Sequence, residues 1–280
     1  MENTYTSNPL TKDWDNMFIL DACRHDIFEE IIDQDPEPVI VDASNSLEYV
    51  EKYMRDHKFE DTIYVTANPF GSHLDDTFYK KSVTFQTDES GEKADVDDLE
   101  KNWSPEYVHN EAIKSFESDK RIVVHFMQPH APYFGSQADK IREKCGYELS
   151  AWGGNSELSH LLDLAQKGKI DRETLMELYI GNLNVVLDYA LSLAKEFGGK
   201  TVITSDHGEM LGESKSFLRH NMGGMRRYMG HGYGIFTEEL RKVPWFIKKY
   251  GNRRRIIPGE IDSGSQIKNT DRQLKALGYK

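Results

Sequence analysis

Two aspartates and a histidine are the residues of this chain best suited to chemistry. Asp21 directly follows the apolar segment 17–20, and Asp206 and His207 follow the apolar segment 201–204 with one serine between. If both segments are parallel strands, the two carboxylates meet at one sheet edge, where like charges repel unless a cation lies between them. The imidazole of His207 completes a mixed oxygen and nitrogen ligand set, which favours Zn²⁺ or Mn²⁺, with Ca²⁺ or Mg²⁺ as alternatives. Such an ion could polarise a phosphoryl or sulfuryl oxygen and activate a bound hydroxyl.

Strand-like and helix-like segments alternate along the chain, which is the pattern of a parallel sheet covered by helices. We expect strands at residues 17–20, 39–41, 61–66, 121–127, 201–204 and 243–247, with a β-like piece at 81–87. Helices are expected after residue 26 (Asp26 and Glu29 as a capping box), at 47–55, after Ser104-Pro105, from 171 to the glycines at 198–199, and at 271–277. These elements predict an α/β fold, a three-layer α/β/α sandwich with a mostly parallel central sheet, formed by residues 1–280 as a single domain.

Composition limits the classes of function. The 280 residues carry 35 Lys and Arg against 47 Asp and Glu, a net charge of −12, which argues against nucleic acid as a partner. With 38% hydrophobic residues the chain is too apolar to be disordered, and no apolar run is long enough to span a membrane. Because no secretory signal is visible and only Cys23 and Cys145 are present, we expect a cytoplasmic protein without disulfides. The oligomeric state is left open.

Several motifs resemble one known superfamily. TSDHGEMLGE at 204–213 is similar to the signature of the alkaline phosphatase superfamily, in its sulfatase and phosphoethanolamine-transferase branch, and HFMQPHAPY at 125–133 resembles the second motif of that branch. FILDACRHD at 18–26 is similar to the opening strand of sulfatase-like proteins common in archaea. The segments 177–209, 230–246 and 274–279 resemble further elements of the same branch, whereas residues 60–100 and 135–170 match poorly.

The resemblance implies roles for individual residues. Asp21, Asp206 and His207 match metal ligands of the superfamily, and His130 matches a histidine that contacts the anion or protonates the leaving group. His231 resembles a later histidine that serves the same anion or a second metal, so one or two ions are implied. The nucleophile of the superfamily lies at a helix N-terminus after the second strand, which here is Ser44-Asn45-Ser46. We favour Ser46, with Ser44 as the second candidate, because a helix N-terminus and a metal both help to ionise a serine.

One departure from the sulfatase pattern shapes the predicted activity. Sulfatases convert a cysteine or serine in a Cys/Ser-x-Pro-x-Arg motif to formylglycine, and Cys23, Ser44 and Ser46 all lack the proline and arginine. The sequence therefore favours a metal-dependent hydrolase of phosphate esters with a serine nucleophile and a small anionic ester as substrate. The alternatives are a sulfuric ester hydrolase or a phosphoryl-headgroup transferase of the same superfamily, and a catalytically silent anion-binding protein.

Simpler interpretations remain for the same residues. Asp206-His207 is also compatible with a plain turn at a strand end, because Asp and Gly are ordinary turn residues. Ser44, Asn45 and Ser46 are all good helix caps, with Asn45 and Glu48 as a capping box, so capping alone is the simpler role for each. Arg24 either pairs with Asp26 or contacts the anionic substrate. His125 lies inside an apolar strand, so we expect it to be a core residue, and Cys23 is expected to be buried and inert.

Overall fold

The computed structural model describes residues 7–84, 102–145, 162, 164–214 and 227–261. The helices of this part are α1 (His25–Ile32), α2 (Ser46–Tyr53), α4 (Pro105–Ser115), α5 (Ser136–Cys145), α7 (Arg172–Phe197) and α8 (Glu238–Arg241), with 3-10 turns η1 (Pro9–Thr11) and η2 (Pro69–His73). The strands are β1 (Asn16–Leu20), β2 (Glu37–Ile40), β3 (Phe59–Thr66), β4 (Phe78–Val83), β5 (Arg121–Phe126), β6 (Gly199–Thr204), β7 (Met210–Ser214), β8 (Arg227–Gly230) and β9 (Lys242–Tyr250).

Seven of these strands form one twisted sheet in the order β2-β9-β6-β1-β5-β3-β4. The pairs β6–β1, β1–β5, β5–β3 and β3–β4 are parallel, whereas β9 is antiparallel to both β6 and β2. The four-residue helix α8 leads directly into β9. The prediction of a mostly parallel central sheet is confirmed.

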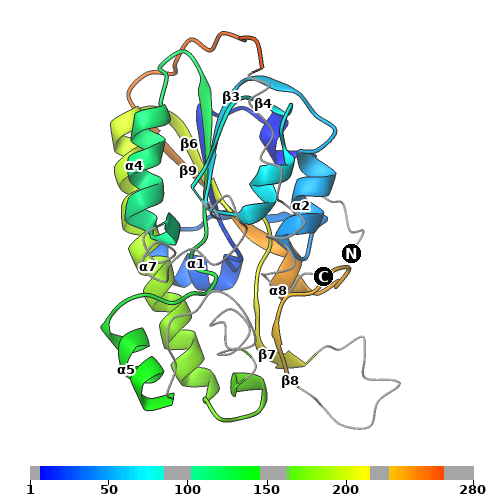
Figure 1. Ribbon diagram of the computed structural model, residues 1–280, viewed down its shortest axis with the longest axis vertical. Coiled ribbons are helices and arrows are strands. Elements are labelled where there is room, and N and C mark those ends of the chain that lie inside the picture. Colours follow the sequence, from blue (N-terminus) through cyan, green and yellow to red (C-terminus); the bar gives the residue numbers. More distant parts are fainter. Residues whose placement is uncertain (1–6, 85–101, 146–161, 163, 215–226, 262–280) are drawn as a thin grey trace, which may run out of the picture.

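Helices cover both faces of the sheet (Figure 1). Successive residues of β1 face opposite helical layers. Phe18 and Leu20 pack in the core beneath α1, α4 and α7, whereas Met17 and Ile19 pack in the core beneath α2. Neither face of this strand reaches water, as expected for a parallel strand between two helical layers. The predicted three-layer α/β/α sandwich is therefore observed.

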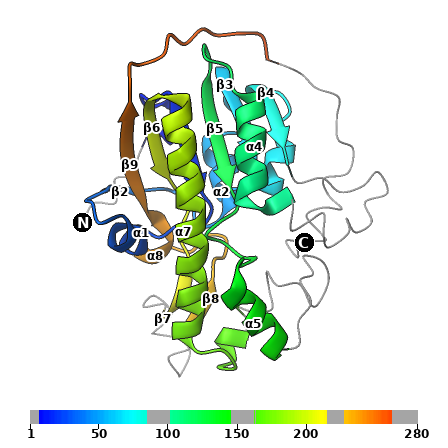
Figure 2. The same cartoon turned by 90° about the vertical axis from the view of Figure 1, so that its left-hand side faces the viewer.

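Helix α7 connects the sheet to the parts of the chain beyond its edge. Its N-terminal half runs past the sheet alongside the β7–β8 hairpin and α5, and its C-terminal half lies on the sheet (Figure 2). Asp171 caps its start by accepting a hydrogen bond from the Thr174 amide, as the sequence predicts. In the described part of the chain, no helix is both long and apolar enough to cross a membrane.

Two details of the predicted elements differ. The capping box expected at the start of α1 is wrong, because the helix begins at His25, two residues earlier, and the carboxylate of Asp26 is engaged by the guanidinium of Arg24. The β-like piece expected at 81–87 is β4, shifted to begin at Phe78. The helix expected at 271–277 lies outside the described residues.

Candidate metal centre and nucleophile

The carboxyl ends of four neighbouring parallel strands bring the predicted ligands together. Asp21 follows β1, Asp206 and His207 follow β6, and Asn68 follows β3, while β5 runs between β1 and β3. This is the edge at which open α/β sheets hold their ligands. All four side chains belong to buried residues, so the cluster lies inside the protein rather than on its surface.

Three of the atoms that face one another in this cluster have no hydrogen-bond partner. The Nε2 atom of His207 lies 3.5 Å from Asp21 Oδ1 and 3.5 Å from Asp206 Oδ2. Both of those carboxylate oxygens are buried without a partner, and so is Nε2 of His125, which lies 3.6 Å from Asp206 Oδ2. Unsatisfied buried polar atoms are costly, so several that converge on one point suit a site for a bound ion.

The protonation of His207 suits this position to a cation. Its Nδ1 lies 2.8 Å from the carbonyl oxygen of Gly208, which can only accept, so Nδ1 carries the proton. Burial lowers the pKa of His207, which keeps the ring neutral at pH 7 and leaves a lone pair on Nε2. That lone pair points at two carboxylates, an arrangement that a metal ion bound between the three groups would stabilise.

The two carboxylates titrate very differently in the absence of a cation. Burial raises the pKa of Asp21 well above 3.8, and the charge of Asp206 raises it further. Burial acts on Asp206 in the same direction, but His207 and His125 outweigh it and lower the pKa of that carboxyl. A cation bound between the two carboxylates would oppose the effects of burial and of Asp206 and favour the ionised form of Asp21.

The hydroxyl of Ser46 lies within this cluster. Ser46 is the first residue of α2, and its Oγ lies 3.2 Å from Asp21 Oδ2 and 3.3 Å from Nε2 of His207. The same Asp21 oxygen accepts a hydrogen bond from Asn68 Nδ2 at 2.7 Å. Asn45 caps the helix by accepting from the Glu48 amide, so the predicted capping role falls to Asn45 and leaves the Ser46 hydroxyl to the cluster.

Ser44 has different partners. Its Oγ lies 2.6 Å from Glu48 Oε2 and 2.7 Å from the carbonyl oxygen of Gly232, and it accepts from the amide of Ile235. The other oxygen of Glu48 accepts from the Gly234 amide. Ser44 and Glu48 thus fasten the segment after His231 to helix α2, and of the two candidate serines only Ser46 contacts the carboxylate cluster.

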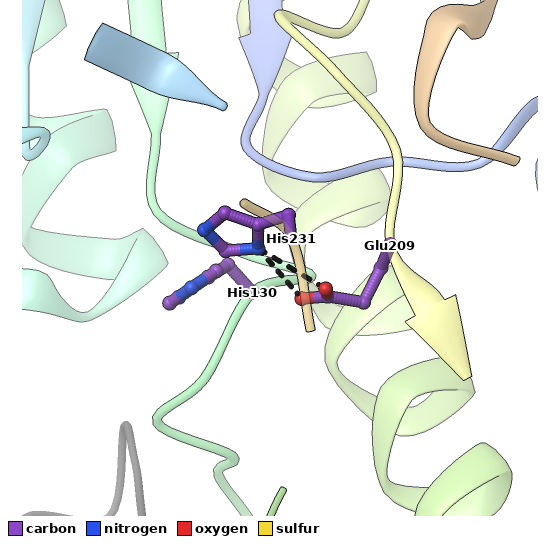
Figure 3. Close-up of side chains that lie close together, drawn as sticks. All are labelled: His130, Glu209 and His231. Atoms are coloured by element: carbon purple, nitrogen blue, oxygen red, sulfur yellow. Dashed lines mark hydrogen bonds and ion pairs between the residues drawn. The ribbon is translucent and has the colours of Figure 1, made fainter. Parts of the chain in front are cut away.

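A second cluster contains His130, Glu209 and His231 (Figure 3). Nδ1 of His231 lies 3.1 Å from one carboxylate oxygen of Glu209 and 3.3 Å from the other. The His231 ring lies 4.5 Å from the His207 ring and 5.0 Å from the His130 ring, centroid to centroid, so it connects the two clusters. One donor atom from each of the three residues lies within 4.8 Å of the others, which is close enough for a common ion.

The charges of the second cluster are set by burial and by Glu209. Burial, and after it the charge of His231, lower the pKa of His130 to about 4, so its ring is neutral at pH 7. Glu209 outweighs the effect of burial on His231 and raises the pKa of that ring. Nδ1 of His130 donates to the carbonyl oxygen of Ala131, which leaves the lone pair on Nε2 to bind a metal or accept a proton.

Arg24 takes the first of its two predicted alternatives. Its Nε and Nη2 bind both carboxylate oxygens of Asp26 at 2.9 and 2.6 Å, and its Nη1 lies 2.6 Å from Glu213 Oε1. The guanidinium is buried and fully paired, so it holds α1 to the start of the β7–β8 hairpin. A contact between Arg24 and the substrate finds no support in this geometry.

Three residues of the clusters were not selected from the sequence: Asn68, His125 and Glu209. His125 is buried and its Nδ1 lies 3.0 Å from the Tyr64 hydroxyl, as expected for a core histidine, but its Nε2 faces the carboxylates. The alternation of residues along β5 does predict which face of the sheet His125 occupies. Ile122, Val124 and Phe126 face the α7 layer, so His125 must face the α2 layer near the strand's carboxyl end. Glu209 has no such signal, because the turn after β6 decides where it points.

Comparisons with known proteins find likeness in structure alone. No protein-family model and no curated protein matches the sequence. The C-terminal periplasmic domain of EcEptC from Escherichia coli, in a complex with Zn, matches at 11% identity and a TM-score of 0.47, over 87% of this chain and 75% of that one. The same domain of phosphoethanolamine transferase EptC from Campylobacter jejuni matches at 15% identity and a TM-score of 0.43, over 83% and 78%.

A third match is a phosphonate monoester hydrolase of Agrobacterium radiobacter, at 12% identity and a TM-score of 0.40, over 84% of this chain and 67% of that one. These proteins belong to the alkaline phosphatase superfamily, the one that the motifs resemble. Because the identities and TM-scores are low, the roles of individual side chains rest on the geometry described above.

Proposed function

We propose that this protein is a metal-dependent enzyme that acts on phosphate esters and uses Ser46 as its nucleophile. The observation that carries the proposal is the position of the Ser46 hydroxyl, which lies within 3.3 Å of both Asp21 and His207 beside three buried atoms without partners. A serine that only caps a helix would need neither the carboxylate pair nor the unprotonated imidazole nitrogen.

The residues present suit a divalent ion. Asp21, Asp206 and His207 offer two carboxylates and one imidazole lone pair, with His125 as a further nitrogen donor. This donor set favours Zn²⁺ or Mn²⁺ over Ca²⁺ or Mg²⁺. His130, Glu209 and His231 could hold a second ion. A bound divalent ion would supply charge stabilisation for the developing phosphoryl oxygens and for an ionised serine.

The chain's own groups account for the remaining steps. The Ser46 oxygen attacks phosphorus and the bond from phosphorus to the leaving oxygen breaks, while the Ser46 proton passes to a neighbouring acceptor such as Asp21. The N-terminus of α2 places amide dipoles behind the attacking oxygen, which stabilise negative charge there. His231, whose pKa is raised, can hold the anion or donate a proton to the departing oxygen, and neutral His130 can bind beside it.

Hydrolase and transferase differ only in what removes the phosphoryl group from Ser46. Water yields a phosphatase or phosphodiesterase, and a second hydroxyl compound yields a transferase. Sulfate esters are the less favoured substrates, because Ser46 is followed by Leu47 and Glu48 and lacks the proline and arginine of the formylglycine motif.

The test compares Ser46→Ala with Ser44→Ala. Metal-stripped protein is given Zn²⁺, Mn²⁺, Mg²⁺ or Ca²⁺ and assayed on aryl phosphomonoesters, phosphodiesters and sulfates. We expect metal-stimulated turnover of a phosphate ester that falls at least about 1,000-fold in Ser46→Ala. Ser44→Ala, which keeps the cluster intact, should retain most of it. Mass spectrometry of acid-quenched enzyme should find a phosphoryl group on the peptide that contains Ser46.

Three outcomes would contradict the proposal. No turnover of any ester with any metal, together with tight binding of phosphate, would favour the silent anion-binding protein. Full activity in Ser46→Ala would rule out Ser46 as the nucleophile, and full activity in Asp206→Ala would rule out a metal site that depends on Asp206.

A further inference from the structure

The side chain of Asn182 is a buried amide in the middle of the apolar face of α7. It is 0% exposed, and the buried residues around it on the helix are hydrophobic, among them Leu178, Leu183 and Val186. A buried amide costs free energy unless its hydrogen bonds are made, so an aliphatic residue would suit this position better if packing were its only task.

All of the polar capacity of Asn182 is used on one loop. Its Nδ2 lies 3.0 Å from the carbonyl oxygen of Pro132, 3.2 Å from that of His130 and 3.4 Å from that of Pro129. Its Oδ1 accepts from the amide of Phe134 at 2.9 Å. The loop that follows β5 is therefore wrapped around a single side chain.

The sequence of the loop explains why it needs such a partner. Two of its residues, Pro129 and Pro132, have no N–H, so the segment cannot satisfy its own carbonyl groups by a regular ladder or helical turn. Buried carbonyl groups need donors from elsewhere, and Asn182 supplies them from the opposite side of the core.

This loop carries His130. The His130 amide donates to the carbonyl oxygen of Asp21 at 3.1 Å, and Asn182 binds the His130 carbonyl from the other side. Since the ring is also fixed by its bond to the Ala131 carbonyl, its position in the second cluster depends on how the loop backbone is held. We propose that Asn182 is a positioning residue, which sets the place of the His130 imidazole beside His231 and Glu209.

The kinetic part of the test rests on the proposed phosphoesterase activity. It is a double-mutant cycle of Asn182→Ala and His130→Ala, because residues that act through one another have non-additive effects. We expect Asn182→Ala to lower kcat/KM by about 10- to 100-fold when His130 is present. In the His130→Ala background the same change should have less than about a twofold effect. An equal loss in both backgrounds, or no loss in either, would overturn the proposal.

Asn16→Ala is the matched control. Asn16 is also a buried amide that donates to a backbone carbonyl, that of Gly198, and to the hydroxyl of Thr201, but it lies at the opposite end of the sheet. Its removal should lower the melting temperature and leave kcat/KM within about twofold. If Asn182→Ala does not fold, Asn182→Ser takes its place in the cycle with the same expected and contradicting outcomes.

A second readout does not depend on activity. In histidine ring NMR spectra, Asn182→Ala should shift the His130 resonances while those of His25, which binds the Pro36 carbonyl, stay in place. An unchanged His130 signal would overturn the positioning role even if the wild-type protein were an active enzyme. A wild-type protein without activity but with a shifted His130 signal would overturn only the proposed function.

Discussion

Replacing Asp21 by Asn should stabilise the metal-free protein and at the same time abolish its response to metal. The substitution keeps the shape of the side chain. An Asn oxygen can accept from Asn68 and Ser46 as Asp21 Oδ2 does, and the new NH2 group would face the lone pair of His207 Nε2, where the unsatisfied Asp21 Oδ1 now lies. The change therefore removes a charge without removing a hydrogen bond.

The size of the gain follows from the separation of the charges. One donor atom each of Asp21 and Asp206 lies within 4.8 Å of the other. Two unit charges at that distance repel by about 3.5 kcal/mol at an effective dielectric constant of ~20. Protonation of Asp21 relieves part of this repulsion in the wild-type protein, so we expect a gain of about 1–3 kcal/mol at pH 7, or roughly 2–6 °C in Tm.

The pH dependence has a definite sign. The pKa of Asp21 is raised in the folded protein by burial and by Asp206, so its ionised form costs stability above the ordinary value of 3.8 and costs nothing below it. The advantage of Asp21→Asn should therefore be largest near neutral pH and disappear as the pH falls towards about 4. Denaturant titrations in a chelating buffer at pH 7 and pH 5 measure the difference directly.

Metal should reverse the ranking of the two proteins. A ligand at 1,000 times its Kd stabilises the folded state by about 4.1 kcal/mol, which exceeds the advantage of Asp21→Asn, and we expect this gain for the wild type with Zn²⁺ or Mn²⁺ and little for Asp21→Asn. Asp15→Asn is the matched control, since Asp15 is a buried carboxylate that binds Arg253 and the Lys200 amide. It should destabilise the protein and leave the response to metal intact. A metal-free Asp21→Asn that is less stable than the wild type at pH 7 would refute the reasoning, as would an unaltered response to metal.

Three further changes test the groups that hold the site. Gly208→Ala would place a methyl group against the backbone carbonyl of Glu239, so the free energy of unfolding should fall by about 2–3 kcal/mol. The affinity for Zn²⁺, measured by calorimetry, should fall at least about tenfold. Tyr179→Phe removes a hydroxyl that donates to one backbone group and accepts from another in the turn after β1, and should cost about 1–3 kcal/mol in denaturant titrations. Burial alone would raise the pKa of Glu213, but Arg24 lowers it, so that stabilising contribution is lost as pH falls below about 4.5. Glu213→Gln should therefore be less stable than the wild type at pH 7 and lose less stability in acid. Wild-type stability in Gly208→Ala or in Tyr179→Phe would contradict the contacts described for those residues. An acid transition that is unchanged in Glu213→Gln would contradict the ion pair with Arg24.

The elements that the sequence predicts correctly are those specified by short-range chemistry. Asp171 and Ser104 cap α7 and α4 as expected, because each is followed three residues later by the amide that it binds. Asn45 caps α2 in the same way. The cap predicted for α1 is wrong because Asp26 forms an ion pair with Arg24 instead of capping the helix. Arg24 also pairs with Glu213, which is distant in sequence, so the local spacing of residues does not predict this arrangement.

The sequence predicts those parts of the site that directly follow the ends of strands. Asp21 and Asp206 meet because both follow parallel neighbouring strands, which the pattern of elements indicates. The choice between Ser44 and Ser46 was not predictable, since both flank the cap of α2 and only the partners of each hydroxyl separate them. Glu209 depends on a turn after β6 whose direction is set by packing against α8.

The charge of the site explains why a cation must accompany an anionic ester. In the part of the chain that the structure describes, the two clusters are built from Asp21, Asp206 and Glu209 with imidazole rings, and the nearby guanidinium of Arg24 is already paired with two carboxylates. A phosphate ester entering such a site would meet like charge in a low-dielectric interior, where repulsion is strongest. A divalent ion held by the first cluster, as proposed, would reverse that local sign, whereas the net charge of −12 over the whole chain is unfavourable to long polyanions.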